Sequence, residues 1–176
     1  HKAVWKKAYI TKATSQLMRD LGSIPSPNNC FLLNIGLETL PLRMERHCSN
    51  AQKTAEFLAS HEKVSKVIYP GLPGDKYHAL AEKYLPNGSC GVISFELEGG
   101  REAAVRFMDS LELANICTHV AASKTMVLHP ASHTHRQMND EQLREAGVSP
   151  GMIRLSVGIE HIDDILADLE KALKNA

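Results

Sequence analysis

Apolar residues alternate with polar ones at the spacing of an α-helix near the start of the chain. A short pattern of this kind runs over residues 13–21 and ends at Gly22, and a glycine commonly follows the last turn of a helix. The next residues, Ser23-Ile24-Pro25-Ser26-Pro27, combine serine and proline and are typical of a connector. The pattern therefore predicts a short helix, a connector and a new element that begins near residue 28.

A longer helical pattern follows the connector. Asn28 or Asn29 can cap its first turn, and its apolar positions up to residue 40 are Phe31, Leu32, Ile35 and Leu40. Pro41 interrupts the pattern, which then continues over 42–60. Because a proline inside a helix removes one hydrogen bond and bends the axis, we expect a long kinked helix. The apolar face of its second part consists of Met44, Cys48, Ala51, Ala55 and Leu58.

After residue 60 the apolar spacing predicts strands and helices in turn. We expect strands at 64–69, 91–97 and 152–157, with short extended segments at 113–116 and 125–128. We expect helices at 77–84, 101–110, 140–145 and 162–173, the last with a clear apolar face. This order predicts an α/β sandwich in which helices cover one face of a mixed or antiparallel sheet. Many proteins share such a layout, so it specifies no function.

The composition is that of an ordinary globular protein. The chain has 176 residues, enough for one domain with its own core, and 43% are apolar while 23% are charged. Twenty basic residues balance twenty acidic ones, so no long-range field draws the chain to nucleic acid or to an anionic membrane. No apolar stretch is long enough to cross a bilayer. Residues 1–7 begin with His rather than Met and lack the apolar centre of a signal peptide.

Four cysteines, Cys30, Cys48, Cys90 and Cys117, lie along the chain without a C-x-x-C pair. Their spacing favours reduced, mostly buried thiols over a disulfide framework or a zinc site. We therefore expect a cytoplasmic protein.

Arg154 is the first candidate for a binding role. It lies in the apolar run of the last predicted strand, which would hold its guanidinium at a defined place. A planar fork of donors suits the bidentate capture of a carboxylate or phosphate. The alternatives are a solvated strand residue or a structural ion pair with Glu160.

A second candidate is the histidine-rich segment His129-Pro130-Ala131-Ser132-His133-Thr134-His135. Three histidines in seven residues can form part of a metal site, with His119 as a nominal fourth ligand. We favour a loop in which Ser132 and Thr134 satisfy backbone groups and the histidines make polar contacts.

Two further features match catalytic motifs only in part. Lys124 is a lone lysine that could act as a Schiff-base nucleophile, but no neighbouring residue is suited to lowering its pKa, and we expect it to be solvated. The glycines of 71–74 and 98–100 lack the Lys and Ser/Thr of a phosphate loop and are interpreted as turns.

Several of these segments, taken in order, resemble the cystathionine gamma-synthase-like family of pyridoxal-phosphate enzymes. Ala8-Tyr9-Ile10-Thr11-Lys12-Ala13 is similar to the corresponding segment of O-acetylhomoserine sulfhydrylases. The other segments that carry the resemblance are 31–40, 42–47, 67–72, 129–132 with 134–135, 147–149 and 154–160. The resemblance covers nearly the whole chain.

The resemblance implies an organisation and a set of site residues. It implies fold type I of the pyridoxal-phosphate enzymes, with a remnant of the large domain at 1–27, an interdomain helix at 28–60 and the C-terminal domain at 61–176. The lysine that holds pyridoxal phosphate would precede residue 1, so we expect no cofactor on this chain alone and no activity. Arg154 would bind the α-carboxylate of the substrate, with His119 and Thr134 beside it. Relatives place Ser or Asn where this chain has His119.

The resemblance also implies a reaction. A full-length protein would make homocysteine or methionine from O-acetylhomoserine and sulfide or a thiol by γ-replacement, as a tetramer that shares active sites between subunits. The alternatives are a methionine gamma-lyase or a cystathionine gamma-synthase parent, or a binding module without catalysis.

Overall fold

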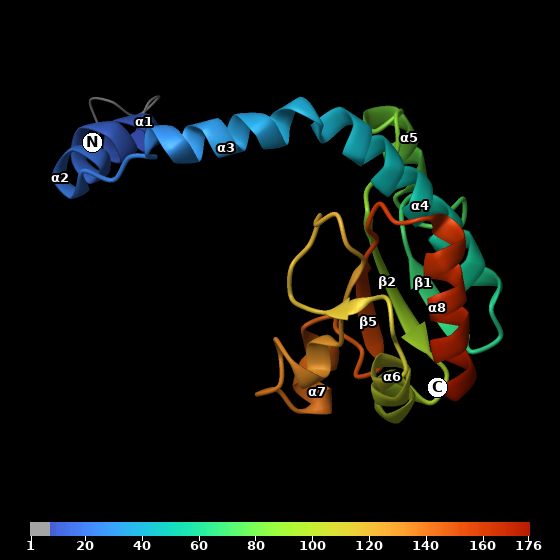
Figure 1. Ribbon diagram of the computed structural model, residues 1–176. Helices are drawn as coiled ribbons and strands as arrows, with labels where there is room; N and C mark the ends of the chain where they lie inside the picture. Colours follow the sequence, from blue (N-terminus) through green and yellow to red (C-terminus); the bar gives the residue numbers. More distant parts are fainter. Residues whose placement is uncertain (1–7) are drawn as a thin grey trace. The chain divides into compact units, whose positions relative to one another are not determined.

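The computed structural model describes residues 8–176, which form two units, one ending at Leu40 and one spanning Pro41–Ala176 (Figure 1). Residues 1–7, on which the prediction about a signal peptide rests, lie outside the described residues.

The first unit is helical. It contains α1 (Ala8–Lys12), the π-helical turn η2 (Ala13–Met18), α2 (Arg19–Leu21) and α3 (Pro27–Glu38). Gly22 ends α2 with a φ of +66°, as the sequence predicted. The expectation that Asn28 or Asn29 caps α3 is wrong. Ser26 is the cap, because its backbone is extended and its Oγ accepts a hydrogen bond from Asn29 N at 3.2 Å.

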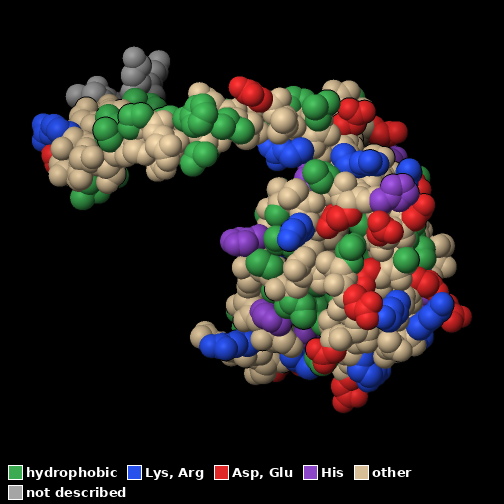
Figure 2. All heavy atoms as spheres, in the orientation of Figure 1, with side chains coloured by type: hydrophobic (Ala, Val, Ile, Leu, Met, Phe, Trp, Pro, Cys, Tyr) green, Lys and Arg blue, Asp and Glu red, His purple; other side chains and the backbone are tan. Residues whose placement is uncertain are grey.

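Apolar side chains of this unit lie at its surface. None of the helical residues between Ala8 and Glu38 is buried. Phe31 is 61% exposed and Leu33 is 64% exposed, and Figure 2 shows hydrophobic side chains along these helices. The apolar spacing therefore predicts the helix but not a core within this unit.

Helix α4 (Leu40–Ser60) carries the second part of the predicted long helix. The expected kinked helix is instead two helices, since regular helical structure stops at Thr39, whose backbone N–H bonds to Leu37 O. Pro41 is the second residue of α4, a position where its missing N–H leaves no helical hydrogen bond unmade.

The second unit contains a mixed five-stranded sheet, which confirms the predicted fold class. The strand order is β1 (Val64–Ile68), β2 (Val92–Leu97), β5 (Met152–Ser156), β4 (Met126–Leu128) and β3 (Asn115–Ile116). The short pair β3–β4 is parallel and the other pairs are antiparallel. The remaining helices are α5 (His78–Tyr84), α6 (Gly100–Asp109), the 3-10 turn η3 (Pro130–Ser132), α7 (Asp140–Glu145) and α8 (Ile162–Asn175).

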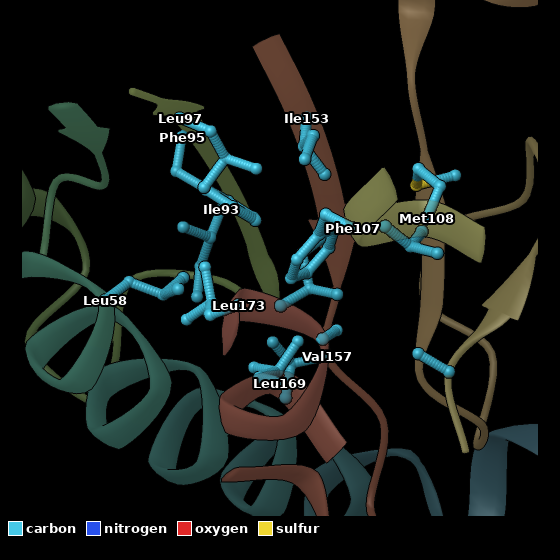
Figure 3. Packing of buried hydrophobic residues seen from close by; sticks show 14 of the residues in the cluster. Leu58, Ile93, Phe95, Leu97, Phe107, Met108, Ile153, Val157, Leu169 and Leu173 are labelled. Carbon is cyan, nitrogen blue, oxygen red and sulfur yellow. The ribbon is translucent and has the colours of Figure 1, made fainter. Parts of the chain in front are cut away.

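One face of the sheet packs against α4, α6 and α8. Figure 3 shows Leu58 of α4, Phe107 of α6 and Leu169 of α8 directed toward the side chains of β2 and β5. Phe107 meets Phe95 edge to face, with ring centroids 5.7 Å apart. Alternation along β5 directs Ile153 and Leu155 into this core, so Arg154 lies on the opposite face of the sheet.

The cysteines are less buried than expected. All four are free thiols, Cys30 is exposed, and Cys48, Cys90 and Cys117 are half-buried. Burial and the nearby Cys90 raise the pKa of the Cys48 thiol. None of the helices within residues 8–176 is both long enough and apolar enough to cross a membrane.

Candidate functional site

Arg154 lies in β5 with its guanidinium directed at the loop 117–125. Its Nη2 donates to Thr118 O at 2.7 Å, and its Nε is buried without a hydrogen-bond partner among residues 8–176. No acidic side chain in that range forms an ion pair with it, because Glu160, the partner considered above, binds Thr125 instead. A partly buried guanidinium that is always charged and lacks an acidic partner is suited to bind an anion.

The loop 117–125 is held against β5 and the residues that follow it. Ala121 N donates to Ser156 Oγ at 2.9 Å, and Ile159 N donates to Ser123 O at 2.9 Å. Ala121 has a φ of +59°, which is unfavourable for a residue with a side chain, so the loop keeps this conformation only because its surroundings impose it. His119 is exposed on this loop, directly after the Thr118 carbonyl that binds Arg154.

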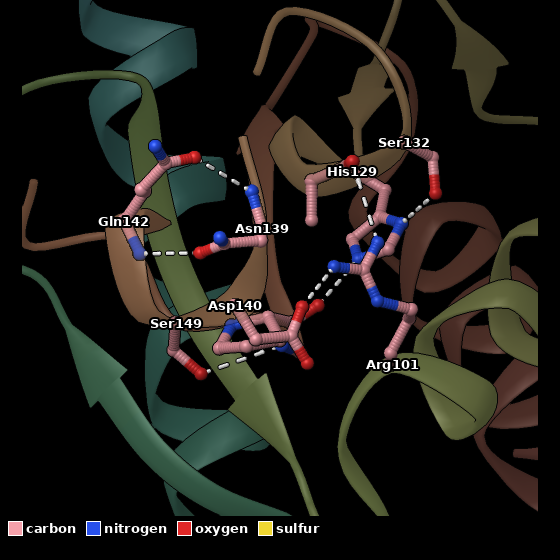
Figure 4. A network of polar contacts seen from close by, with 10 residues as sticks. Arg101, His129, Ser132, Asn139, Asp140, Gln142 and Ser149 are labelled. Carbon is pink, nitrogen blue, oxygen red and sulfur yellow. Dashed lines mark hydrogen bonds and ion pairs between the residues drawn. The ribbon is translucent and has the colours of Figure 1, made fainter. Parts of the chain in front are cut away.

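His129 holds the histidine-rich segment 129–135, which includes Thr134, in place. The imidazole is 1% exposed, and its Nε2 donates to Pro150 O at 2.8 Å. This hydrogen bond leaves Nδ1 free to accept from Ser132 Oγ at 2.8 Å (Figure 4). Burial lowers the pKa of the His129 imidazole, with smaller contributions from the positive charge of Arg101 and from His133. His129 is therefore a neutral structural residue of this segment.

Further polar contacts hold the segment 129–135 and the start of α7. Arg101 forms an ion pair with Asp140 and donates to Ala131 O, while Asn139 and Gln142 form a reciprocal capping box at the start of α7 (Figure 4). The expected backbone contacts of Ser132 and Thr134 are wrong. Thr134 is exposed, and its Oγ1 bonds to His135 Nδ1 at 2.9 Å, so both hydroxyls bind imidazole groups.

The three predicted site residues thus lie on three different segments. Arg154 and the loop of His119 are joined directly, through the Thr118 carbonyl. Leu128, just before the segment of Thr134, pairs with Arg154 across β4 and β5. No hydrogen bond connects Thr134 with either of the other two among the described residues. The supporting residues Ser156 and Thr125 were not predicted, although the period of two along the strand puts Ser156 on the same face as Arg154.

The lysines within residues 8–176 lie almost entirely at the surface. Of the nine lysines within residues 8–176, eight are exposed, Lys124 among them as expected, and Lys63 is half-buried with its Nζ donating to backbone carbonyls at the end of α8. In the same range, no three His, Cys, Asp or Glu side chains converge to hold a metal ion.

A family described as the Cys/Met metabolism PLP-dependent enzymes, where PLP is pyridoxal phosphate, matches residues 3–174. The chain belongs to this family. Its fold agrees with a crystal structure described as an O-acetylhomoserine (thiol)-lyase from Campylobacter jejuni, with a TM-score of 0.85 and 41% identity over 93% of this chain and 39% of that one. That structure carries an N′-pyridoxyl-lysine-5′-monophosphate.

Two curated relatives agree with this membership. The chain is 52% identical to an O-acetyl-L-homoserine sulfhydrylase of Leptospira meyeri, over 96% of this chain and 38% of the relative. It is 47% identical to a homocysteine synthase of Schizosaccharomyces pombe, over 96% of this chain and 39% of the relative. The chain therefore spans somewhat more than a third of the length of these relatives.

Proposed function

We propose that this chain is the C-terminal part of a longer pyridoxal-phosphate enzyme that makes homocysteine or methionine from O-acetylhomoserine and sulfide or a thiol. In this proposal, residues 28–60 link the two domains and 61–176 form the domain that binds the substrate. The cofactor would be held by the remainder of the polypeptide and would supply the electron sink for the reaction. The names of the relatives support the proposed substrate, and their greater length supports the assignment of cofactor binding to another part of the polypeptide.

The observation that carries the proposal is the state of Arg154. Its guanidinium lies on the face of the sheet opposite the core, is held at one nitrogen by Thr118 O, and has no acidic partner within residues 8–176. The α-carboxylate of an amino acid matches such a fork of donors. Arg154 then positions the substrate, and His119 and Thr134, both exposed, would be neighbours of the bound amino acid.

The test is steady-state kinetics of the complete enzyme with Arg154→Ala and Arg154→Lys. Because this contact exists in the ground state and the transition state alike, we expect Arg154→Ala mainly to raise KM for O-acetylhomoserine, by about 10- to 100-fold. Arg154→Lys keeps the positive charge but not the fork of donors. Its KM should therefore lie between those of the wild type and Arg154→Ala. An unchanged KM in Arg154→Ala contradicts the assignment, and so does turnover by the 176-residue chain alone with added cofactor.

A further inference from the structure

Glu160 uses both oxygens of its carboxylate to bind a single residue, Thr125. Its Oε1 accepts from Thr125 N at 2.6 Å and its Oε2 accepts from Thr125 Oγ1 at 3.0 Å. Thr125 Oγ1 in turn accepts from Gly158 N at 2.9 Å. Hydrogen bonds to an ionised acceptor are stronger than neutral ones. Glu160 has no ion-pair partner within the described range 8–176, so both of its oxygens are committed to Thr125.

We propose that Thr125 and Glu160 form a clasp that positions Arg154 by fixing the loop 117–125. The inference rests on the proposed function for what Arg154 binds. Neither residue of the clasp forms a hydrogen bond or ion pair with Arg154 within residues 8–176, so both are positioning residues that act through the loop.

The Glu160 side of the clasp is anchored in the core. Asn50 of α4 is buried, and its Nδ2 donates to Gly158 O at 3.0 Å and to Glu160 O at 2.9 Å. His47, one turn earlier, contributes its Nδ1 to a 2.7 Å hydrogen bond with Val157 O. Buried polar groups that satisfy three carbonyls of the segment 157–160 in this way fix the backbone that carries Glu160.

Gly158 allows the close approach that the clasp needs. A Cβ at this position would lie 2.5 Å from Thr125 N and would overlap Glu160 Oε2 as well. The segment 157–160 therefore lies directly against Thr125, with no room for a side chain between them.

The Thr125 side of the clasp leads to Arg154. Thr125 closes the loop whose other end is held by a hydrogen bond from Cys117 N to Val127 O at 3.0 Å. Between these ends lie Ala121, with its unfavourable positive φ, and Thr118, whose carbonyl binds the guanidinium. Because a loop with a strained residue relaxes when its restraints are removed, opening the clasp should release Thr118 O from Arg154.

The first experiment is amide hydrogen exchange of the 176-residue chain. Thr125→Val keeps the shape and removes the hydroxyl, whereas Thr125→Ser keeps the hydroxyl and is the matched control. We expect Thr125→Val to speed exchange at Ala121 and Ile159 by at least about tenfold, with Phe95 and Leu155 in the central strands changed by less than about twofold. Thr125→Ser should behave like the wild type. The clasp is overturned if Ala121 and Ile159 keep their protection in Thr125→Val, or if the two variants behave alike.

Glu160→Gln keeps the experiment decisive if Thr125→Val does not fold. The amide retains one acceptor for Thr125 N but loses the second acceptor and the charge. We expect faster exchange at Ala121 and Ile159 than in the wild type, by about three- to tenfold, with the core amides again unchanged. Unchanged exchange at the two loop positions overturns the clasp.

The second experiment separates this inference from the proposed function. In the complete enzyme, Thr125→Val should raise KM for O-acetylhomoserine about tenfold, while kcat changes by less than about twofold. The control variant Thr125→Ser should have the KM of the wild type. If Arg154→Ala raises KM but Thr125→Val does not, the clasp is overturned and the proposed function stands. If Arg154→Ala leaves KM unchanged, the proposed function is overturned, while the exchange data still decide whether the clasp orders the loop.

Discussion

The two faces of β5 are held in different ways. On one face Ile153 and Leu155 are 0% exposed and pack among α4, α6 and α8. On the other face Arg154 and Ser156 each bind one residue of the loop 117–125, by single hydrogen bonds of 2.7 Å and 2.9 Å. A buried apolar side chain stabilises the fold through contacts of many atoms at once, whereas a single hydrogen bond adds only about 1 kcal/mol to the stability.

This difference indicates that the core face of β5 contributes mainly to stability, whereas the face that carries Arg154 contributes mainly to the proposed binding. Loss of a core side chain should lower the stability of the whole domain, whereas loss of a loop contact should mainly disorder the loop. Three substitutions test that division, beginning with the one expected to have the largest effect.

Leu155→Ala should destabilise the second unit by about 2–5 kcal/mol, because it removes a fully buried side chain from the middle of the sheet. Leu155→Met is the matched control, since it nearly conserves volume and should cost less than about 1.5 kcal/mol. Urea denaturation followed by circular dichroism measures both. A loss below about 1 kcal/mol for Leu155→Ala would mean that the core face is not the main source of stability.

Gly158→Ala should cost about 1–3 kcal/mol, because the new methyl group meets the backbone nitrogen of Thr125 at 2.5 Å and must push the two segments apart. Gly74→Ala is the control, as nothing lies within 4 Å of its added Cβ. Denaturation measures the cost, and amide exchange shows where it falls. Faster exchange confined to the loop 117–125 would support the distinction between the two faces of β5. An equal loss of protection in the core strands would contradict it.

The sequence predicted the second unit better than the first. The predicted bounds of β2 and β5 differ from the observed ones by one residue each, because alternating apolar positions reflect burial on one face of a sheet. The spacing of Phe31, Leu32 and Ile35 predicted a helix equally well, yet these side chains are exposed. Periodicity reports which side chains share a face, and it does not report whether another part of a protein covers that face.

The candidate site was predicted only in its local part. Arg154 stood out because it interrupts an apolar strand, and the family resemblance drew attention to His119. The contact of Arg154 with Thr118 joins residues 36 positions apart, and the clasp of Thr125 with Glu160 joins residues 35 positions apart. Such pairings depend on the order of strands in the sheet, which no local pattern encodes. For that reason Glu160 was considered as a partner of Arg154 rather than of Thr125.

The smallest expected effect is a pH dependence that arises from His129, beside the site face. Burial lowers the pKa of this imidazole below its ordinary 6.5, so below that pH the unfolded chain takes up a proton that the folded chain does not. Stability from this group is therefore present above about pH 6.5 and is lost as the pH falls toward the lowered value. His129→Gln keeps a donor for Pro150 O without a titrating group, so its unfolding free energy should fall less than that of the wild type between about pH 7.5 and 5.5. Equal losses in the two proteins, measured by urea denaturation, would show that His129 is protonated as readily in the fold as in the unfolded chain.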